Sequence, residues 1–263
     1  MTPNPKPMWQ AILAAIDANS PLMTSFSHRL TTTLAAAAIA SFALPVAHVR
    51  AEDAPKDFSA AERALFMTNQ FTKLRPPMTL HYAFHRSGSL EPGFDDKVSI
   101  SLKAQANGQC CDASGDFLSG EHAVVLPPVE GVTGNPVMLY FLERDVREME
   151  RLTKGKQAYF RKRIRMAIYQ GAQQRAVTLR YRGNAVTGQE FTIDPYRDDP
   201  NRPRFEQLSN KRYVFTMSDA VPGGVYAIRS VITDAAKGAD APPLVADELL
   251  IEGAEPTPPK PGA

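Results

Sequence analysis

The sequence contains only two cysteines and one tryptophan, and it has no marked excess of either charge. Its 263 residues include 30 basic and 28 acidic side chains, which gives a net charge of +2. Residues 1–51 hold three of the basic residues and one acidic residue, so the rest of the chain carries 27 of each sign. Because a near-neutral protein has no general field that attracts phosphate backbones, nucleic-acid binding is disfavoured.

Motifs that mark common catalytic and cofactor sites are also missing. The sequence lacks a Gly-x-Ser-x-Gly elbow, a His-Glu-x-x-His pair, a phosphate-cradling glycine-rich loop and a Cys-x-x-Cys pair. We therefore expect no cofactor and no resident metal ion, and we favour a binding protein over an enzyme. A serine–histidine–aspartate site is defined by space rather than by sequence order, so that class of enzyme stays open.

The chain has no uncharged apolar run of about 20 residues, which is the length that a membrane-spanning helix needs. It does have a shorter, Ala-rich run, Leu34–Leu44, which follows the basic residue Arg29. This order of a positive residue and a short apolar run is typical of a secretory signal peptide. A buried Ala-rich helix is the alternative.

The residues around this run indicate where the signal peptide begins and ends. Val49-Arg50-Ala51 places short residues where a signal peptidase cleaves, and charge resumes at Glu52. We expect the start at Met23, cleavage after Ala51 and an upstream extension over 1–22. The mature product should then be periplasmic.

The two cysteines, Cys110 and Cys111, are adjacent in a polar stretch, 107–115, that we expect to form a loop. Free thiols need a reason in an oxidising compartment. An ordinary structural disulfide joins residues with Cα atoms about 5.5 Å apart, whereas neighbours lie only about 3.8 Å apart. A vicinal disulfide, a bridge between two chains, a soft-metal site and a pair of buried small side chains remain as alternatives. The protein would accordingly be a monomer or a cysteine-linked dimer.

Local patterns predict a sheet interrupted by helices. A capping box at Ser59–Glu62 predicts a helix over 57–71, and Asn135-Pro136 predicts the start of two helices that extend to about residue 168. Alternating apolar residues predict strands at 79–85, 98–102, 123–126, 177–181, 213–217 and 225–232, a strand ending near Ile193, and a final edge strand at 249–251.

This order predicts an α+β protein, with a curved antiparallel β-sheet, an inserted helical hairpin and an N-terminal helix. We expect one domain over 52–252, followed by a disordered, Pro-rich tail over 253–263.

Two histidines fall on the first predicted strand. Four strand residues span about 13 Å, so His81 and His85 cannot share one metal ion, and we expect both to face solvent. A hydrolase site built from His85, Asp95 and the loop Asp194–Asn201 is one alternative function.

The predicted helical hairpin is rich in charge. One cluster in it contains basic residues without acidic ones between them: Arg161, Lys162, Arg163 and Arg165. This cluster is a candidate surface for an acidic partner or a lipid headgroup. In the first helix of the hairpin, Asp145, Glu148 and Glu150 are expected to form pairs three or four residues apart on a solvated face.

Two segments carry a resemblance to other proteins. GNPVMLYFLERDVREMERLTKGKQAYFRKRIRMAI, residues 134–168, and SDAVPGGVY, residues 218–226, resemble those of an uncharacterised family of exported proteobacterial proteins. The resemblance covers most of residues 57–252; it implies export and a common fold but no catalytic residues. The plan of a curved sheet with helices is also similar, at fold level only, to periplasmic lipid and lipoprotein carriers.

The sequence thus favours an exported, non-enzymatic protein that binds an apolar small molecule or a cell-envelope partner. Five aromatic residues on the predicted strands are candidates for the apolar lining, with a purely structural role in the core as the alternative: Tyr82, Phe84, Tyr213, Phe215 and Tyr226. The hydrolase site and a metal or redox role for Cys110 and Cys111 remain as alternative functions.

Overall fold

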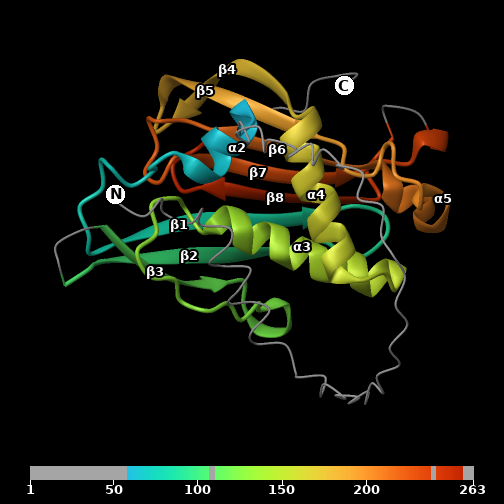
Figure 1. The fold of residues 1–263 in the computed structure, drawn as a ribbon, viewed down its shortest axis with the longest axis horizontal. Helices are drawn as coiled ribbons and strands as arrows, with labels where there is room; N and C mark the ends of the chain where they lie inside the picture. Colours follow the sequence, from blue (N-terminus) through green and yellow to red (C-terminus); the bar gives the residue numbers. More distant parts are fainter. Residues whose placement is uncertain (1–57, 107–109, 238–240, 257–263) are drawn as a thin grey trace, which may run out of the picture.

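The computed structural model describes residues 58–106, 110–237 and 241–256. Eight strands form one antiparallel sheet in the order β3-β2-β1-β8-β7-β6-β5-β4, with helices packed on one of its faces (Figure 1). The predicted signal peptide and its cleavage site lie outside the described residues.

The strands are β1 (Met78–Ser87), β2 (Phe94–Ala104), β3 (Cys110–Phe117), β4 (Gln173–Tyr181), β5 (Asn184–Ile193), β6 (Lys211–Met217), β7 (Val225–Ile232) and β8 (Val245–Ile251). The helical segments are α2 (Ala60–Glu62), the π-helical turn η1 (Arg63–Met67), η2 (Gly120–His122), α3 (Val137–Thr153), α4 (Gln157–Gly171), α5 (Arg202–Phe205), η3 (Glu206–Asn210) and η4 (Ala235–Lys237). The predicted α+β class, the curved sheet, the N-terminal helix and the helical hairpin are confirmed.

The N-terminal helix begins at the predicted capping box. The Ser59 amide donates to Glu62 Oε2 at 3.0 Å, and the Glu62 amide donates to Ser59 Oγ at 3.1 Å. These two bonds satisfy amides that the first helical turn leaves open. The helical geometry ends at Met67 rather than at the predicted Phe71, because Thr68 is already extended.

Alternation along the strands decides which side chains meet the helices. Side chains of β1 are alternately buried and exposed, so Leu80, Tyr82 and Phe84 face the interior while His81 and His85 face solvent, as predicted. The register places one buried apolar residue from each of five neighbouring strands in a single row across the sheet. The row consists of Phe84, Leu249, Ile228, Phe215 and Phe191.

Two of the strand predictions are wrong. The strand predicted at 123–126 does not form, and the strand predicted at the edge of the sheet lies at its centre. Residues 123–126 contribute only an isolated bridge between Val124 and Phe117, and the third strand is instead β3, which begins at the cysteines that we expected in a loop. β8 is not an edge strand, because it lies between β1 and β7 in the centre of the sheet. Both differences arise from pairing between distant segments, which a local pattern does not contain.

The sheet curls toward its β4 end. β4 is the outermost strand, four places from β8, yet Tyr181 at its end bridges to Ala254, just beyond β8. The Arg182 amide also donates to the Gly253 carbonyl at 2.7 Å. Residues 253–256, which composition assigned to a disordered tail, therefore pack against the β4–β5 hairpin, and the remaining tail residues lie outside the described part of the chain.

Candidate functional site

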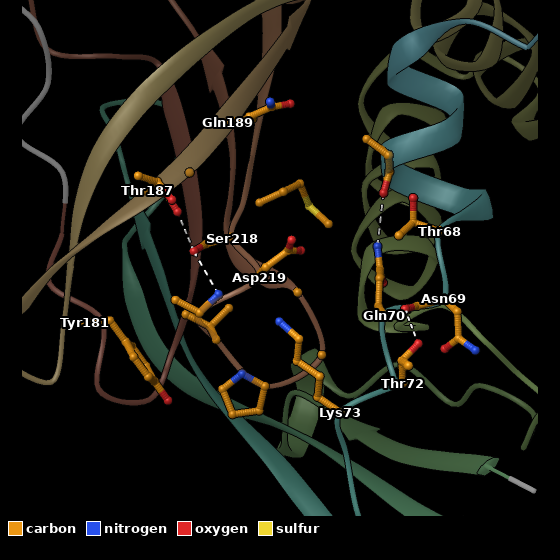
Figure 2. A pocket seen from close by; sticks show the side chains of 18 of the residues that line it. Thr68, Asn69, Gln70, Thr72, Lys73, Tyr181, Thr187, Gln189, Ser218 and Asp219 are labelled. Carbon is orange, nitrogen blue, oxygen red and sulfur yellow. Dashed lines mark hydrogen bonds between the residues drawn. The ribbon is translucent and has the colours of Figure 1, made fainter.

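A cleft of about 900 Å³ opens between the N-terminal helical segment and the β4–β6 end of the sheet. One wall, called the helical wall below, is formed by residues between Ala64 and Leu74. The opposite wall, called the loop wall, is formed by β5 and the loop 218–224 that joins β6 to β7. Figure 2 shows Thr68, Asn69, Gln70, Thr72 and Lys73 facing Thr187, Gln189, Ser218 and Asp219 across this space.

The two walls are fastened to each other by Asn135, the residue before Pro136 at the start of α3. Its amide N–H donates to Gln70 Oε1 at 2.7 Å, and its side-chain Nδ2 donates to the Gly223 carbonyl at 3.1 Å and to the Tyr82 hydroxyl at 2.7 Å. Asn135 is fully buried. It thus connects the helical wall, the loop wall and the sheet beneath them.

The loop wall is held by its own hydrogen bonds. The Ser218 amide donates to the Gly224 carbonyl at 2.9 Å, and Ser218 Oγ donates to the Thr187 carbonyl on β5 at 2.7 Å. Gly223 has a φ of +70°, and a Cβ there would lie 2.7 Å from both the Asn135 and Leu80 side chains. The turn thus needs glycine for conformation and for space.

The lining of the cleft is apolar at depth and polar at the mouth. Phe191 and Val221 are buried, and Leu74 and Met217 are half-buried. The polar lining residues that reach solvent include three charged side chains, Lys73, Arg182 and Asp219. This arrangement can accommodate a molecule with an apolar body and a polar end.

A second cluster of polar residues is sealed beneath α3 rather than open to solvent. In the row of the sheet next to the apolar one, Arg86, Asp247, Ser230 and Tyr213 are neighbours. The Arg86 guanidinium donates to Asp247 at 2.7 and 2.9 Å and to Glu148 of α3 at 2.9 Å. Arg144 of α3 donates to Asp247 at 2.9 Å, so each charge in this group has an opposite partner.

Asp145 forms the other half of the buried cluster. Lys211 Nζ and the Tyr213 hydroxyl both donate to its carboxylate, and Asp145 and Lys211 are almost completely buried. The prediction of a solvated face for Asp145 is therefore wrong, because α3 turns this face toward the sheet. Glu148 does pair with Arg151 three residues away, as predicted, at 2.9 Å.

The pKa values of Glu148 and Asp247 show whether burial or the neighbouring arginines have the larger effect. Burial by itself raises the pKa of Glu148, but hydrogen bonds and charge from Arg151 and Arg86 outweigh it and lower the pKa to about 2. Burial opposes ionisation of Asp247 as well, and Arg86 and Arg144 reverse that effect, so the pKa of Asp247 is lowered. Glu148 and Asp247 therefore stay ionised, and their ion pairs join α3 to the sheet.

The five aromatic residues predicted to line an apolar site are all buried in the interior. The Tyr82 hydroxyl accepts from Asn135, the Tyr213 hydroxyl donates to Asp145, and the Tyr226 hydroxyl donates to the Arg180 carbonyl at 2.6 Å. Phe84 and Phe215 belong to the apolar row. Within the described residues, none of the five contributes to the lining of the cleft.

Two members of the predicted basic cluster make identified contacts inside the protein. Arg161 donates to Glu143 at 2.9 and 2.7 Å, and Arg163 forms an ion pair with Asp199 at 3.0 Å. Lys162 and Arg165 are exposed. Two members of the cluster are thus engaged in holding α4 to α3 and to the loop after β5.

Cys110 and Cys111 are bonded to each other in a vicinal disulfide at the start of the edge strand β3. Of the alternatives that the sequence leaves open, the structure has this one, which leaves no thiol for a bridge to a second chain. Cys111 is buried in the core.

The residues of the predicted hydrolase site are only partly assembled. His85 Nδ1 lies 2.7 Å from Asp95 Oδ1 on the exposed face of the sheet. The loop Asp194–Asn201 follows β5, four strands away from β1, which corresponds to about 19 Å at the usual strand spacing. Asp194 contacts Arg197 and Arg212 instead.

Other features of the described residues bear on binding. None of the helices in this part of the chain has the length and apolar character that a bilayer-spanning segment requires. Within the same ranges, no group of three or more metal-ligating side chains is gathered.

Comparisons with known proteins do not define a family for this chain. No family model matches it, and no curated protein matches it. Among solved structures, the lipoprotein LppX of Mycobacterium tuberculosis is similar at 10% sequence identity and a TM-score of 0.29, over 68% of this chain and 87% of LppX. A likeness at this level carries no argument about function, so the resemblance to an exported family stays a prediction.

The sequence does not predict the cleft, although one of its walls lies in a segment that carries the resemblance to other proteins. The loop of the loop wall lies within residues 218–226, which connect two predicted strands, and no pattern in this segment marks a binding site. The opposite wall, Ala64–Leu74, has no pattern that marks it as part of a site. Only the three-dimensional structure brings the two together.

Proposed function

We propose that this chain is an exported, periplasmic binding protein that holds a small amphipathic molecule in the cleft. The observation that carries the proposal is the cleft itself, about 900 Å³ in volume, which lies within the range of about 300–1,000 Å³ typical of ligand sites. Its apolar depth and polar mouth suit a ligand with one apolar and one polar end.

The sequence is what supports export in this proposal. The positive residue, the short apolar run and the small residues before Glu52 form a signal-peptide pattern. A protein that acts in an aqueous compartment next to membranes would encounter amphipathic molecules. The proposed location and the proposed ligand class are thus consistent with each other.

The experiment uses protein secreted from the full-length chain and a neutral apolar dye, N-phenyl-1-naphthylamine. Intact mass of the periplasmic fraction should show a chain that begins at Glu52. The dye should fluoresce on binding, and Ala176→Trp, which places an indole in the cleft from β4, should lower its affinity by about tenfold or more.

The matched control is Ala83→Trp. Ala83 is also an exposed alanine on a strand, but it lies on β1 and does not line the cleft. We expect this variant to bind the dye like the unmodified protein. Equal dye affinity in all three proteins would show that the cleft is not the binding site.

A further inference from the structure

The charged residues at the mouth of the cleft stand on different walls. Lys73 belongs to the helical wall and Asp219 to the loop wall, and both side chains are exposed. Figure 2 shows Lys73 extending between the walls toward the loop that carries Asp219. A ligand that enters the cleft therefore meets a positive group on one side and a negative group on the other.

Neither charge is neutralised by the part of the protein that the structure describes. Within residues 58–106, 110–237 and 241–256, neither Lys73 nor Asp219 has an ion-pair partner, and they do not pair with each other. Elsewhere on the surface, acidic residues do have nearby bases, such as Asp194 with Arg212 at 2.8 Å. The two cleft charges are therefore available to groups on a ligand.

The third charge of the lining is Arg182, in the turn between β4 and β5. Its guanidinium lies 5.3 Å from the centre of the Tyr181 ring, and its backbone is tied to Gly253. With Arg182 included, the lining carries two positive charges and one negative charge, so a purely cationic ligand is disfavoured. A purely anionic ligand would gain from Lys73 and Arg182 but would leave Asp219 without a partner.

We propose that the cleft selects amphiphiles whose polar end carries both an anionic and a cationic group, the anion on Lys73 and the cation on Asp219. This inference rests on the proposed function and specifies its ligand class. The apolar part of such a molecule would lie against Phe191, Met217 and Val221, which form the depth of the cleft. A phosphate joined to an ammonium group by a short linker has this chemistry.

The test compares two soluble lipids with the same short chains, dihexanoyl phosphatidylethanolamine and dihexanoyl phosphatidylglycerol, by titration calorimetry. Both have a phosphate, but only the first has an ammonium group. Lys73→Gln should weaken both lipids by about two- to fivefold, the range of a solvent-exposed ion pair. Asp219→Asn should weaken the phosphatidylethanolamine by a similar factor and strengthen the phosphatidylglycerol.

Matched controls are Lys97→Gln and Asp116→Asn, exposed charges on β2 and β3 that do not line the cleft; they should change neither affinity. If Asp219→Asn leaves the phosphatidylethanolamine affinity unchanged or raises it, or if the neutral dye binds and neither lipid does, the selectivity is overturned while the cleft remains a binding site. If dye and lipids all fail to bind, the proposed function itself fails.

Discussion

Among single residues, Lys211 and Asp145 form the most deeply buried charge pair of the described chain, with side chains that are 1% and 0% exposed. Removing a charge from water is costly, and only close opposite partners and hydrogen bonds compensate for it. The Tyr213 hydroxyl supplies one such bond to Asp145. The stability of the buried Asp145–Lys211 pair therefore depends on both charges and on the Tyr213 hydroxyl.

Lys211→Met should lower the free energy of unfolding by about 3–5 kcal/mol, because it leaves Asp145 buried without its partner. Urea unfolding measures this loss. The triple variant Lys211→Met, Asp145→Leu, Tyr213→Phe removes the whole polar group and should be more stable than the single variant. Lys97→Met, at an exposed lysine of β2, should change stability by no more than about 0.5 kcal/mol.

These residues also show where sequence patterns stop being informative. In α3 the charged residues Arg144, Asp145 and Glu148 fall between apolar ones, and a helical pattern assigns such positions to solvent. Their partners Arg86, Lys211 and Asp247 lie on three strands that are far away in the sequence. Asn135 was likewise predicted only as a helix cap, and its contacts with Gln70 and Gly223 require the folded chain.

At the scale of elements, α3 is joined to the sheet by both packing and charge. Its buried apolar residues, such as Phe141 and Met149, pack in the core. Its ionised carboxylate Glu148 lies between Arg86 and Arg151. The strength of this helix–sheet contact should therefore depend on pH.

The folded protein lowers the pKa of Glu148 from an ordinary 4.5 to about 2. A lowered pKa contributes stability above the ordinary value, and that contribution is lost as the pH falls through the folded-state value. We expect the urea midpoint to fall as the pH is lowered from 4.5 to 2, and Asp247 acts in the same direction. Glu148→Gln should make this fall shallower.

The control for the pH experiment is Glu121→Gln, because the Glu121 side chain is 89% exposed. Its pH profile should match that of the unmodified protein. If Glu148→Gln has an equally steep profile, the ion pairs of Glu148 do not contribute to acid sensitivity.

The elements differ in how far the sequence predicts them. The residues of β6 and β7 alternate clearly on both sides of a Pro-Gly-Gly turn, and the α3–α4 pair has regular apolar spacing, so the sequence predicts these strands and helices. β3 contains Asp, Ser and Gly, which are typical of loops, and it forms a strand because β2 pairs with it over seven residue pairs. Propensity is overridden there by tertiary pairing.

At the scale of the whole molecule, β8 joins two groups of strands. β1, β2 and β3 lie on one side of it and β4, β5, β6 and β7 on the other. β8 pairs with β1 over six residue pairs and with β7 over another six. Without this strand, the two groups share no edge in the sheet.

A chain that ends at Lys237 should therefore fail to fold cooperatively, because the facing edges of β1 and β7 stay unpaired and their apolar sides exposed. A chain that ends at Pro256 keeps β8 and the contacts of Gly253 and Glu255 with the β4–β5 hairpin. It should unfold like the full-length protein. Circular dichroism with heating compares the two truncations, and cooperative melting of the shorter one would contradict the central role of β8.

The central place of β8 has a consequence for when the protein folds. The ribosome makes β8 after the other seven strands of the described sheet, so the sheet cannot be completed before this strand has been made. An exported chain has to remain unfolded until it has passed through the translocation channel. A sheet that waits for its last strand delays folding, which would suit the export that we propose for this protein.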